Sequence, residues 1–365
     1  AEANPVVAHI AVATGAVGVY VQQVPNEPLT FTGDGEPRRE DSLMAYAWDR
    51  YLRTGDATWL PRLPMTKSVV RAMDTVTDFC ATPAGGGLSI ESFVVAGSSK
   101  RGWTTWTTAV VDPRVVAIVP MVIDLLNVET SFRHHYRAYG FWSPAVGEYV
   151  ALHILDWFGT REFHALEEIE DPYSYRDRLT LPKLIVNATG DPLFLPDSSR
   201  FYFDKLKGEK HLRYVPNADH SLNGTDAFDG LLAFFREIVE GVPRPELTWR
   251  FEGRTAIRVW TGTKRRPSEV RLWKASNPDA RDFRLETIGP QWIATLLEPR
   301  ADGVYVGRVD SPARGWTAFF VEMTYPSGGN EPLKLTTAVR VVPDTLPHKD
   351  PPHGTSRPTD PRLAR

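Results

Sequence analysis

Several polar residues of this sequence lie where apolar, strand-like runs end, and their types suit nucleophilic catalysis. Ser99 follows the run SFVVAG and precedes a helix-like segment that starts near Arg101. A serine at a sharp turn from a strand into a helix exposes its hydroxyl, and the helix N-terminus offers amides to a developing oxyanion. Ser99 is therefore the candidate nucleophile, and the backbone amide of Lys100 is the candidate oxyanion donor.

Glycines around this turn distinguish Ser99 from its neighbour Ser98. Gly97 lies two residues before Ser99, whereas the equivalent position for Ser98 is Ala96. The usual G-x-S-x-G pattern is matched imperfectly, because Gly102 comes one place late. A G-x-S triplet after a strand also occurs as an ordinary helix N-cap. The motif therefore needs catalytic partners elsewhere in the chain.

A serine nucleophile needs a histidine base, and the base needs a carboxylate that orients it. The strand-like run KLIVNATG ends at Asp191, and the later run HLRYVPNADH carries His220. The chain order serine, acid, histidine is that of the α/β-hydrolase fold. We therefore predict a triad of Ser99, Asp191 and His220, with Asp197 as a competing acid that lies further from its strand.

The elements that must position these residues follow from the hydrophobic pattern. Short apolar runs alternate with helical patterns, which predicts an α/β fold with a mostly parallel sheet and helices on both faces. We expect an α/β-hydrolase domain over residues 1–242. Short alternating runs separated by Pro, Gly and Asn predict an immunoglobulin-like antiparallel β-sandwich over residues 247–343. The Pro-rich polar segment 344–365 is predicted to be disordered.

The region of residues 125–179 is rich in aromatic residues and histidine, and it is too long for a simple connection between strands. We interpret it as a helical insertion that caps the sheet. Its histidines are alternative bases, but they precede the acid and, as neighbours on a helix, point in different directions. Side chains suited to a substrate pocket are His134, His135, Tyr136, Trp142 and Glu148.

The segment EDSLMAYAWDRYLR places apolar residues at helical spacing and predicts an amphipathic helix over residues 40–53. Its first two residues, Glu40 and Asp41, are carboxylates at the positive end of the helix dipole. We favour this capping role for both side chains over contact with a substrate amine.

Composition excludes several classes of function. With 42% hydrophobic residues, 24% charged residues and a net charge of -3, the chain resembles an ordinary globular protein without the basic excess of nucleic-acid binders. No apolar stretch approaches the roughly 20 residues of a membrane span. The single cysteine excludes a cysteine-built zinc site, and no other metal cluster or phosphate loop is evident. We expect no cofactor and a small-molecule or peptide substrate; nothing indicates an oligomeric state.

Several long segments closely resemble the PhoPQ-activated pathogenicity-related proteins, among them VPNEPLTF, EDSLMAYAW, FVVAGSSKRGWTTW, DPRVVAIVPMVID and RYVPNADHSL. LWKASNPDARDFR, GWTAFFVEMTY and TTAVRVVPDTLP match as well, so the resemblance extends through Pro347. It implies an α/β-hydrolase domain with an appended β-sandwich. It also implies an exported bacterial protein associated with virulence or with resistance to antimicrobial peptides.

The serine turn also resembles the G-C-S-R-x-G pattern of glucuronoyl esterases, with Ser98 for the cysteine and Lys100 for the arginine. This resemblance implies a carbohydrate esterase as an alternative. It further implies an oxyanion role for the Lys100 ammonium, beside the simpler interpretation of a solvated lysine.

Members of the first family carry an N-terminal segment with early strands and a glycine-rich loop, which is expected to supply half of the oxyanion hole. The sequence shows no such loop before Ser99, nor the basic and apolar pattern of a signal peptide. We therefore expect an N-terminally truncated chain that lacks its second oxyanion donor. A non-catalytic secreted binding or signalling protein that retains the hydrolase fold is accordingly the alternative to an active esterase or peptidase.

Overall fold

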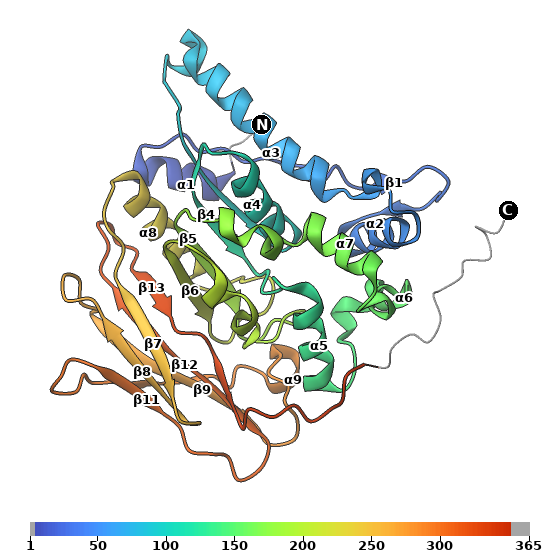
Figure 1. The fold of residues 1–365 in the computed structure, drawn as a ribbon. Coiled ribbons are helices and arrows are strands. Elements are labelled where there is room, and N and C mark those ends of the chain that lie inside the picture. The colour runs from blue at the N-terminus through green and yellow to red at the C-terminus, as the bar shows by residue number, and fades with distance from the viewer. Residues whose placement is uncertain (1–3, 352–365) are drawn as a thin grey trace.

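A computed structural model describes residues 4–351 of the chain and shows four parallel strands at its centre (Figure 1). In chain order they are β3 (Phe93–Ser98), β4 (Val115–Met121), β5 (Lys183–Ala188) and β6 (Lys210–Val215), each paired with the next. Every residue of β5 is buried, as expected for a strand covered on both faces. The predicted α/β class with a parallel sheet is confirmed.

Successive residues of the central strands face two different hydrophobic cores. Ile118 and Ile185 belong to the core that contains Trp106 of α4 (Lys100–Val111). Val119 belongs to the opposite core, which contains Phe234 of α8 (Ala227–Val239). Helices therefore cover both faces of the sheet, and each fully buried large apolar side chain contributes about 1.5–3 kcal/mol.

Three further α-helices of the described residues lie before the serine turn. These are α1 (Pro5–Thr14), which contacts α8, and α2 (Glu40–Thr54) and α3 (Arg62–Ala81), which lie on the α4 side. A two-stranded ribbon of β1 (Leu29–Thr30) and β2 (Pro37–Arg38) leads into α2. The apolar stripe of α2 is buried at Leu43, Met44 and Trp48, in agreement with the helical spacing of its sequence.

The region predicted as a helical insertion connects β4 to β5 and contains α5 (Val128–Tyr139), α6 (Gly147–Ala151) and α7 (Arg161–Glu170). Its helices pack against α2 through aromatic side chains. The ring of Trp48 lies 5.5 Å from that of Tyr149 and 6.1 Å from that of Phe163, in edge-on arrangements. The start of α2 is thereby fixed next to the insertion.

The C-terminal region is antiparallel and extends the central sheet. Its strands are β9 (Glu269–Asn277), β10 (Ile293–Leu296), β12 (Trp316–Tyr325), β13 (Leu333–Thr336) and β14 (Arg340–Val342). Because Thr336 of β13 pairs with Leu212 of β6, the strand order is β10-β9-β12-β13-β6-β5-β4-β3. The short helix α9 (Leu285–Ile288) lies between β9 and β10.

A second antiparallel sheet contains β7 (Leu247–Glu252), β8 (Ala256–Thr261) and β11 (Tyr305–Arg308). Ile257 and Val259 of β8 share a hydrophobic core with Phe319 and Val321 of β12. The expected C-terminal antiparallel structure is thus present, while an immunoglobulin-like sandwich stays a prediction.

Residues 344–350, which the sequence analysis assigns to a disordered tail, contact the rest of the chain. Asp344 pairs with Arg200 at 2.8 Å, and the His348 amide donates to the Arg137 carbonyl at 3.1 Å. The remainder of the predicted tail, residues 352–365, lies outside the described residues. Between residues 4 and 351, no helix has the length and apolar character needed to cross a bilayer.

Two glycines allow β3 and α4 to approach each other closely. A Cβ on Gly97 would lie 2.6 Å from the Arg101 carbonyl oxygen, and one on Gly102 would lie 2.9 Å from the carbonyl oxygens of Gly97 and Met121. These contacts involve backbone atoms, which cannot move aside as a flexible side chain can. The second glycine is therefore required at position 102, one place later than in the usual motif.

We expect Gly102→Ala to lower the free energy of unfolding by about 1–3 kcal/mol, because the added methyl group overpacks this contact. Denaturant unfolding monitored by circular dichroism measures the change. Gly147→Ala in α6 is the matched control, since its Cβ would meet nothing within 4 Å. Equal stability of the two variants would contradict the packing argument.

Candidate active site

Ser99 occupies the turn between β3 and α4 with φ 55° and ψ -127°. Its amide donates to the Met121 carbonyl at 2.9 Å, and its carbonyl accepts from the Trp103 amide at 3.0 Å. A serine with positive φ is strained, and such strain persists only where the surrounding structure enforces it. The observed geometry is that of a nucleophile-bearing turn.

His220 and Asp191 are in direct contact. His220 Nδ1 lies 2.7 Å from Asp191 Oδ2, while Asp191 Oδ1 accepts from the Leu193 amide at 2.8 Å. Asp191 is buried, and the His220 side chain is 25% exposed. With Nδ1 bonded to the carboxylate, the proton is placed on Nδ1 and Nε2 is left as the basic nitrogen.

The electrostatic surroundings of His220 favour its protonated form. Burial on its own would lower the pKa of the imidazole. The hydrogen bond and charge of Asp191, with smaller contributions from Asp41 and Asp219, outweigh burial and raise the pKa above the ordinary value of 6.5. The His220 imidazole therefore binds a proton more readily than an ordinary histidine does.

The loops after β5 and β6 hold this pair at the same edge of the sheet as Ser99. The Gly190 amide donates to the Ala218 carbonyl at 2.9 Å and joins the two loops. The ring of Phe194 lies 6.0 Å from that of His220, and Phe194 lines a pocket together with Ser99. Within residues 4–351 no hydrogen bond joins Ser99 to His220; catalytic hydrogen bonds often form only in the substrate complex.

Asp197, the competing acid, belongs to a different cluster. Its carboxylate pairs with Arg281 at 2.6 Å and with His134 Nε2 at 3.0 Å, and all three side chains are buried. Burial would raise the pKa of Asp197, but the charges and hydrogen bonds of Arg281 and His134 hold it well below its usual range. The structure therefore places Asp191, rather than Asp197, against His220.

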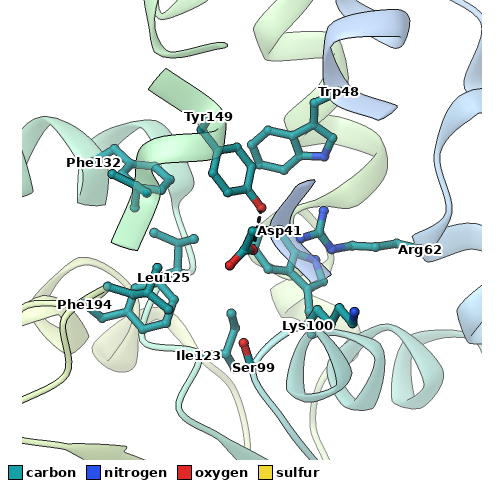
Figure 2. Close-up of a pocket in the computed structure, with 13 residues that line it drawn as sticks. Asp41, Trp48, Arg62, Ser99, Lys100, Ile123, Leu125, Phe132, Tyr149 and Phe194 are labelled. Atoms are coloured by element: carbon teal, nitrogen blue, oxygen red, sulfur yellow. Dashed lines mark hydrogen bonds between the residues drawn. The ribbon is translucent and has the colours of Figure 1, made fainter. Parts of the chain in front are cut away.

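The pocket at Ser99 is small and mostly apolar. Its empty volume is about 420 Å³, part of which is open to solvent. Figure 2 shows the Ser99 hydroxyl at its base, with the carboxylate of Asp41 and the hydroxyl of Tyr149 above it. The apolar wall includes Trp48, Trp103, Ile123, Leu125, Phe132 and Phe194.

The residues predicted to bind substrate lie elsewhere in the insertion. His134 pairs with Asp197, and His135 accepts from the Ser143 amide at 3.1 Å. Burial lowers the pKa of His135 to about 3, so this ring is neutral. The Trp142 ring packs on His135 at 5.7 Å and on Tyr136 at 4.9 Å, and Glu148 is exposed at the start of α6.

The pocket residues that the insertion does supply are Leu125, Phe132, Val146 and Tyr149. These aromatic and apolar types were part of the predicted cap, but their positions were not singled out. The sequence gives a helical period for α5, and that period alone does not tell which face of a capping helix turns toward the pocket.

The Lys100 ammonium is neither solvated nor aimed at the pocket. It is buried in an ion pair with Glu27 and lies 2.6 Å from Glu40 Oε2, and Arg101 pairs with the same two carboxylates at 3.2 and 3.3 Å. Figure 2 shows its side chain directed away from Ser99. Both sequence interpretations of this side chain need correction, because carboxylates neutralise it. The Lys100 amide, at the first position of α4, has no partner within the helix.

Glu27 is a residue of the site that the sequence reasoning missed. It lies in the segment VPNEPLTF, which the sequence analysis used only for the family resemblance. Besides Lys100 and Arg101, it accepts a hydrogen bond from the Glu40 amide at 2.6 Å. It thereby ties the entry of α2 to the first turn of α4, next to Ser99.

Three features together match the arrangement that the chain order predicts for an α/β-hydrolase. They are the α/β sheet, the strained serine between strand and helix, and the carboxylate–histidine pair in two later loops. The chain belongs to the PhoPQ-activated pathogenicity-related protein family, whose model matches residues 1–284. It is 40% identical over 365 residues to autocrine proliferation repressor protein A of Dictyostelium discoideum, covering 93% of this chain and 73% of that protein.

Among solved structures, an acetyl xylan esterase from Paenibacillus sp. R4 is similar with 18% identity and a TM-score of 0.39, over 50% of this chain and 54% of that chain. The Pyrococcus horikoshii acylaminoacyl peptidase is similar with 14% identity and a TM-score of 0.37, over 54% of this chain and 29% of that chain. The match thus spans about half of the first structure and less of the second.

The contact between Asp191 and His220 predicts a pKa above 6.5 for His220 in a ¹H–¹⁵N NMR titration of the imidazole. Asp191→Asn should lower that pKa, because the largest favourable partner of the imidazolium is lost. Since the folded pKa is raised, the interaction stabilises the fold fully below about pH 6.5 and is lost as pH rises through the folded value. Asp197→Asn is the comparison, and an equal effect of both variants would contradict the assignment.

Proposed function

We propose that this protein is a serine hydrolase that cleaves an ester or amide bond in a small-molecule or peptide substrate. Ser99 Oγ attacks the carbonyl carbon while His220 Nε2 takes the hydroxyl proton. The imidazolium then gives this proton to the leaving group, and water releases the acyl group from Ser99 by the same steps. Asp191 orients His220, and the Lys100 amide donates to the oxyanion.

The observation that supports this proposal most strongly is the backbone of Ser99. A positive φ at a serine is costly, and here it turns the hydroxyl into the apolar pocket. An ordinary helix N-cap serine has extended backbone and bonds the amides of its own helix. Ser99 makes no side-chain capping bond to α4. The strain and the missing capping bond therefore support a nucleophilic use of Ser99 over a capping role.

A second candidate function is suggested by the printed name of the Dictyostelium relative, which describes a repressor of proliferation. In this case the chain would be a secreted signalling protein that retains the fold without turnover. We also propose export for the hydrolase, as the resemblance of its sequence to the family implies. A glucuronoyl-type esterase is less supported, because the Lys100 ammonium is engaged by Glu27 and Glu40.

We expect a fluorophosphonate probe to label the purified protein at Ser99, and Ser99→Ala to abolish the labelling. Asp191→Asn should slow labelling on the order of 10³–10⁴-fold, because the imidazole loses its orienting partner. Gel fluorescence and peptide mass spectrometry measure both effects.

Two controls separate the hydrolase from the signalling protein. Ser98→Ala removes the neighbouring hydroxyl and should leave the label on Ser99. Asp197→Asn should react with the fluorophosphonate probe faster than Asp191→Asn. Circular dichroism confirms beforehand that the Asp197→Asn protein is soluble and folded. A wild-type protein that takes no label would contradict the hydrolase and favour the signalling function.

A further inference from the structure

The pocket beside Ser99 carries one carboxylate, that of Asp41, which is in no ion pair with the described residues. Asp41 accepts a hydrogen bond from the Tyr149 hydroxyl at 3.1 Å, and no ion pair to Asp41 is present among residues 4–351. Figure 2 shows this carboxylate reaching into the pocket above Ser99. Its position is different from that of a simple helix cap, since it faces the cavity and not the amides of α2.

The two cations that line the same pocket are already engaged. Arg62 pairs with Glu170 at 2.6 Å, and both side chains are buried. Lys100 is held by Glu27 and Glu40. Among the residues that line the pocket, Asp41 therefore has no cation in direct contact with it, although the charges of Arg62 and His220 act on it from a distance.

The apolar walls of the pocket strengthen the electrostatic interactions that the Asp41 carboxylate makes. Aromatic and aliphatic side chains surround the cavity, so water screens the carboxylate poorly. Burial raises the pKa of Asp41, against the smaller opposing effects of the Tyr149 hydrogen bond and of the charges of Arg62 and His220. The unpaired carboxylate is therefore disfavoured in this pocket, and a bound cation would stabilise it. The rings of Trp48 and Trp103 line the cavity too, and aromatic faces attract cations.

We infer that Asp41 is the recognition site for a protonated amine carried by the substrate. This inference rests on the proposed hydrolase function and specifies its substrate class: small esters or amides with an ammonium group near the reacting carbonyl. The ammonium would donate to the Asp41 carboxylate while the carbonyl lies at Ser99. A small cavity with apolar walls favours a short aliphatic or aromatic group between these two points.

Binding can be tested without turnover in the Ser99→Ala protein. Ligand-observed NMR compares benzylamine, which is protonated at pH 7, with benzyl alcohol, which has a similar shape and no charge. We expect benzylamine to bind at least about tenfold more tightly, as for a hydrogen bond to a charged group. Adding Asp41→Asn should abolish the difference, whereas Asp229→Asn in the first turn of α8 should retain it.

Asp41→Ser provides a second variant that removes the charge, so it should also lose the preference for the amine, and it keeps the test available if Asp41→Asn folds poorly. Equal binding of amine and alcohol, or a preference that survives in folded Asp41→Asn, would overturn the inference.

Turnover gives an independent reading in the protein with Ser99 intact. For paired 4-nitroanilides with a free or an acetylated amine, we expect Asp41→Asn to lower kcat/KM at least about tenfold for the free amine only. Equal loss on both substrates would overturn the inference. Failure of probe labelling at Ser99 contradicts the hydrolase instead, and the binding comparison still decides the role of Asp41.

Discussion

The close contact between β3 and α4 is the constraint on which the site depends. Gly97 and Gly102 bring backbone atoms of the strand and the helix within distances that a side chain would forbid. The chain between them must then reverse within a few residues, and Ser99 takes the positive φ that this reversal requires. The backbone geometry at Ser99 is thus a consequence of packing, and the strain is maintained by the two hydrophobic cores on either side of the sheet.

The same turn places two positive charges at the N-terminus of α4, where they are unfavourable, and nearby carboxylates compensate for them. Lys100 and Arg101 lie in the first turn of α4, where the helix dipole disfavours cations. Glu27 and Glu40 approach from outside the helix and pair with both residues. Glu40 is adjacent to Asp41, so the pairing that neutralises α4 also fixes the first turn of α2 at the pocket. One ion-pair cluster therefore positions both the turn that carries Ser99 and the pocket carboxylate of Asp41.

Sequence reasoning succeeded where the signal is local or follows chain order. The apolar runs that end at Gly97, Asp191 and near His220 are parallel strands whose loops meet at one edge, as alternating strand and helix patterns require. The contact between Asp191 and His220 follows from that edge. The role of Asp197 could not be predicted, because its partner Arg281 lies 84 residues away in the C-terminal region.

Side-chain orientation in the insertion was the less predictable part. His134 and His135 attract attention by their chemistry, yet both are buried in structural hydrogen bonds. Their burial depends on contacts with Asp197 and Leu193, which come from the acid loop and not from the helix itself. Tyr149 reaches the pocket only because α6 packs against α2. No periodicity within residues 125–179 contains that information.

The uncompensated charge of Asp41 has a consequence for the proposed reaction. An oxyanion that forms at Ser99 develops negative charge in the same poorly screened cavity, and two like charges repel each other strongly there. A substrate ammonium paired with Asp41 would remove this repulsion before the oxyanion forms. Amine recognition would then lower the barrier as well as increase affinity, since the neutralised pocket stabilises the transition state more than the ground state. Charge compensation applies to His220 as well. In the proposed reaction, the carboxylates that raise the pKa of His220 also stabilise the imidazolium that forms when Ser99 attacks.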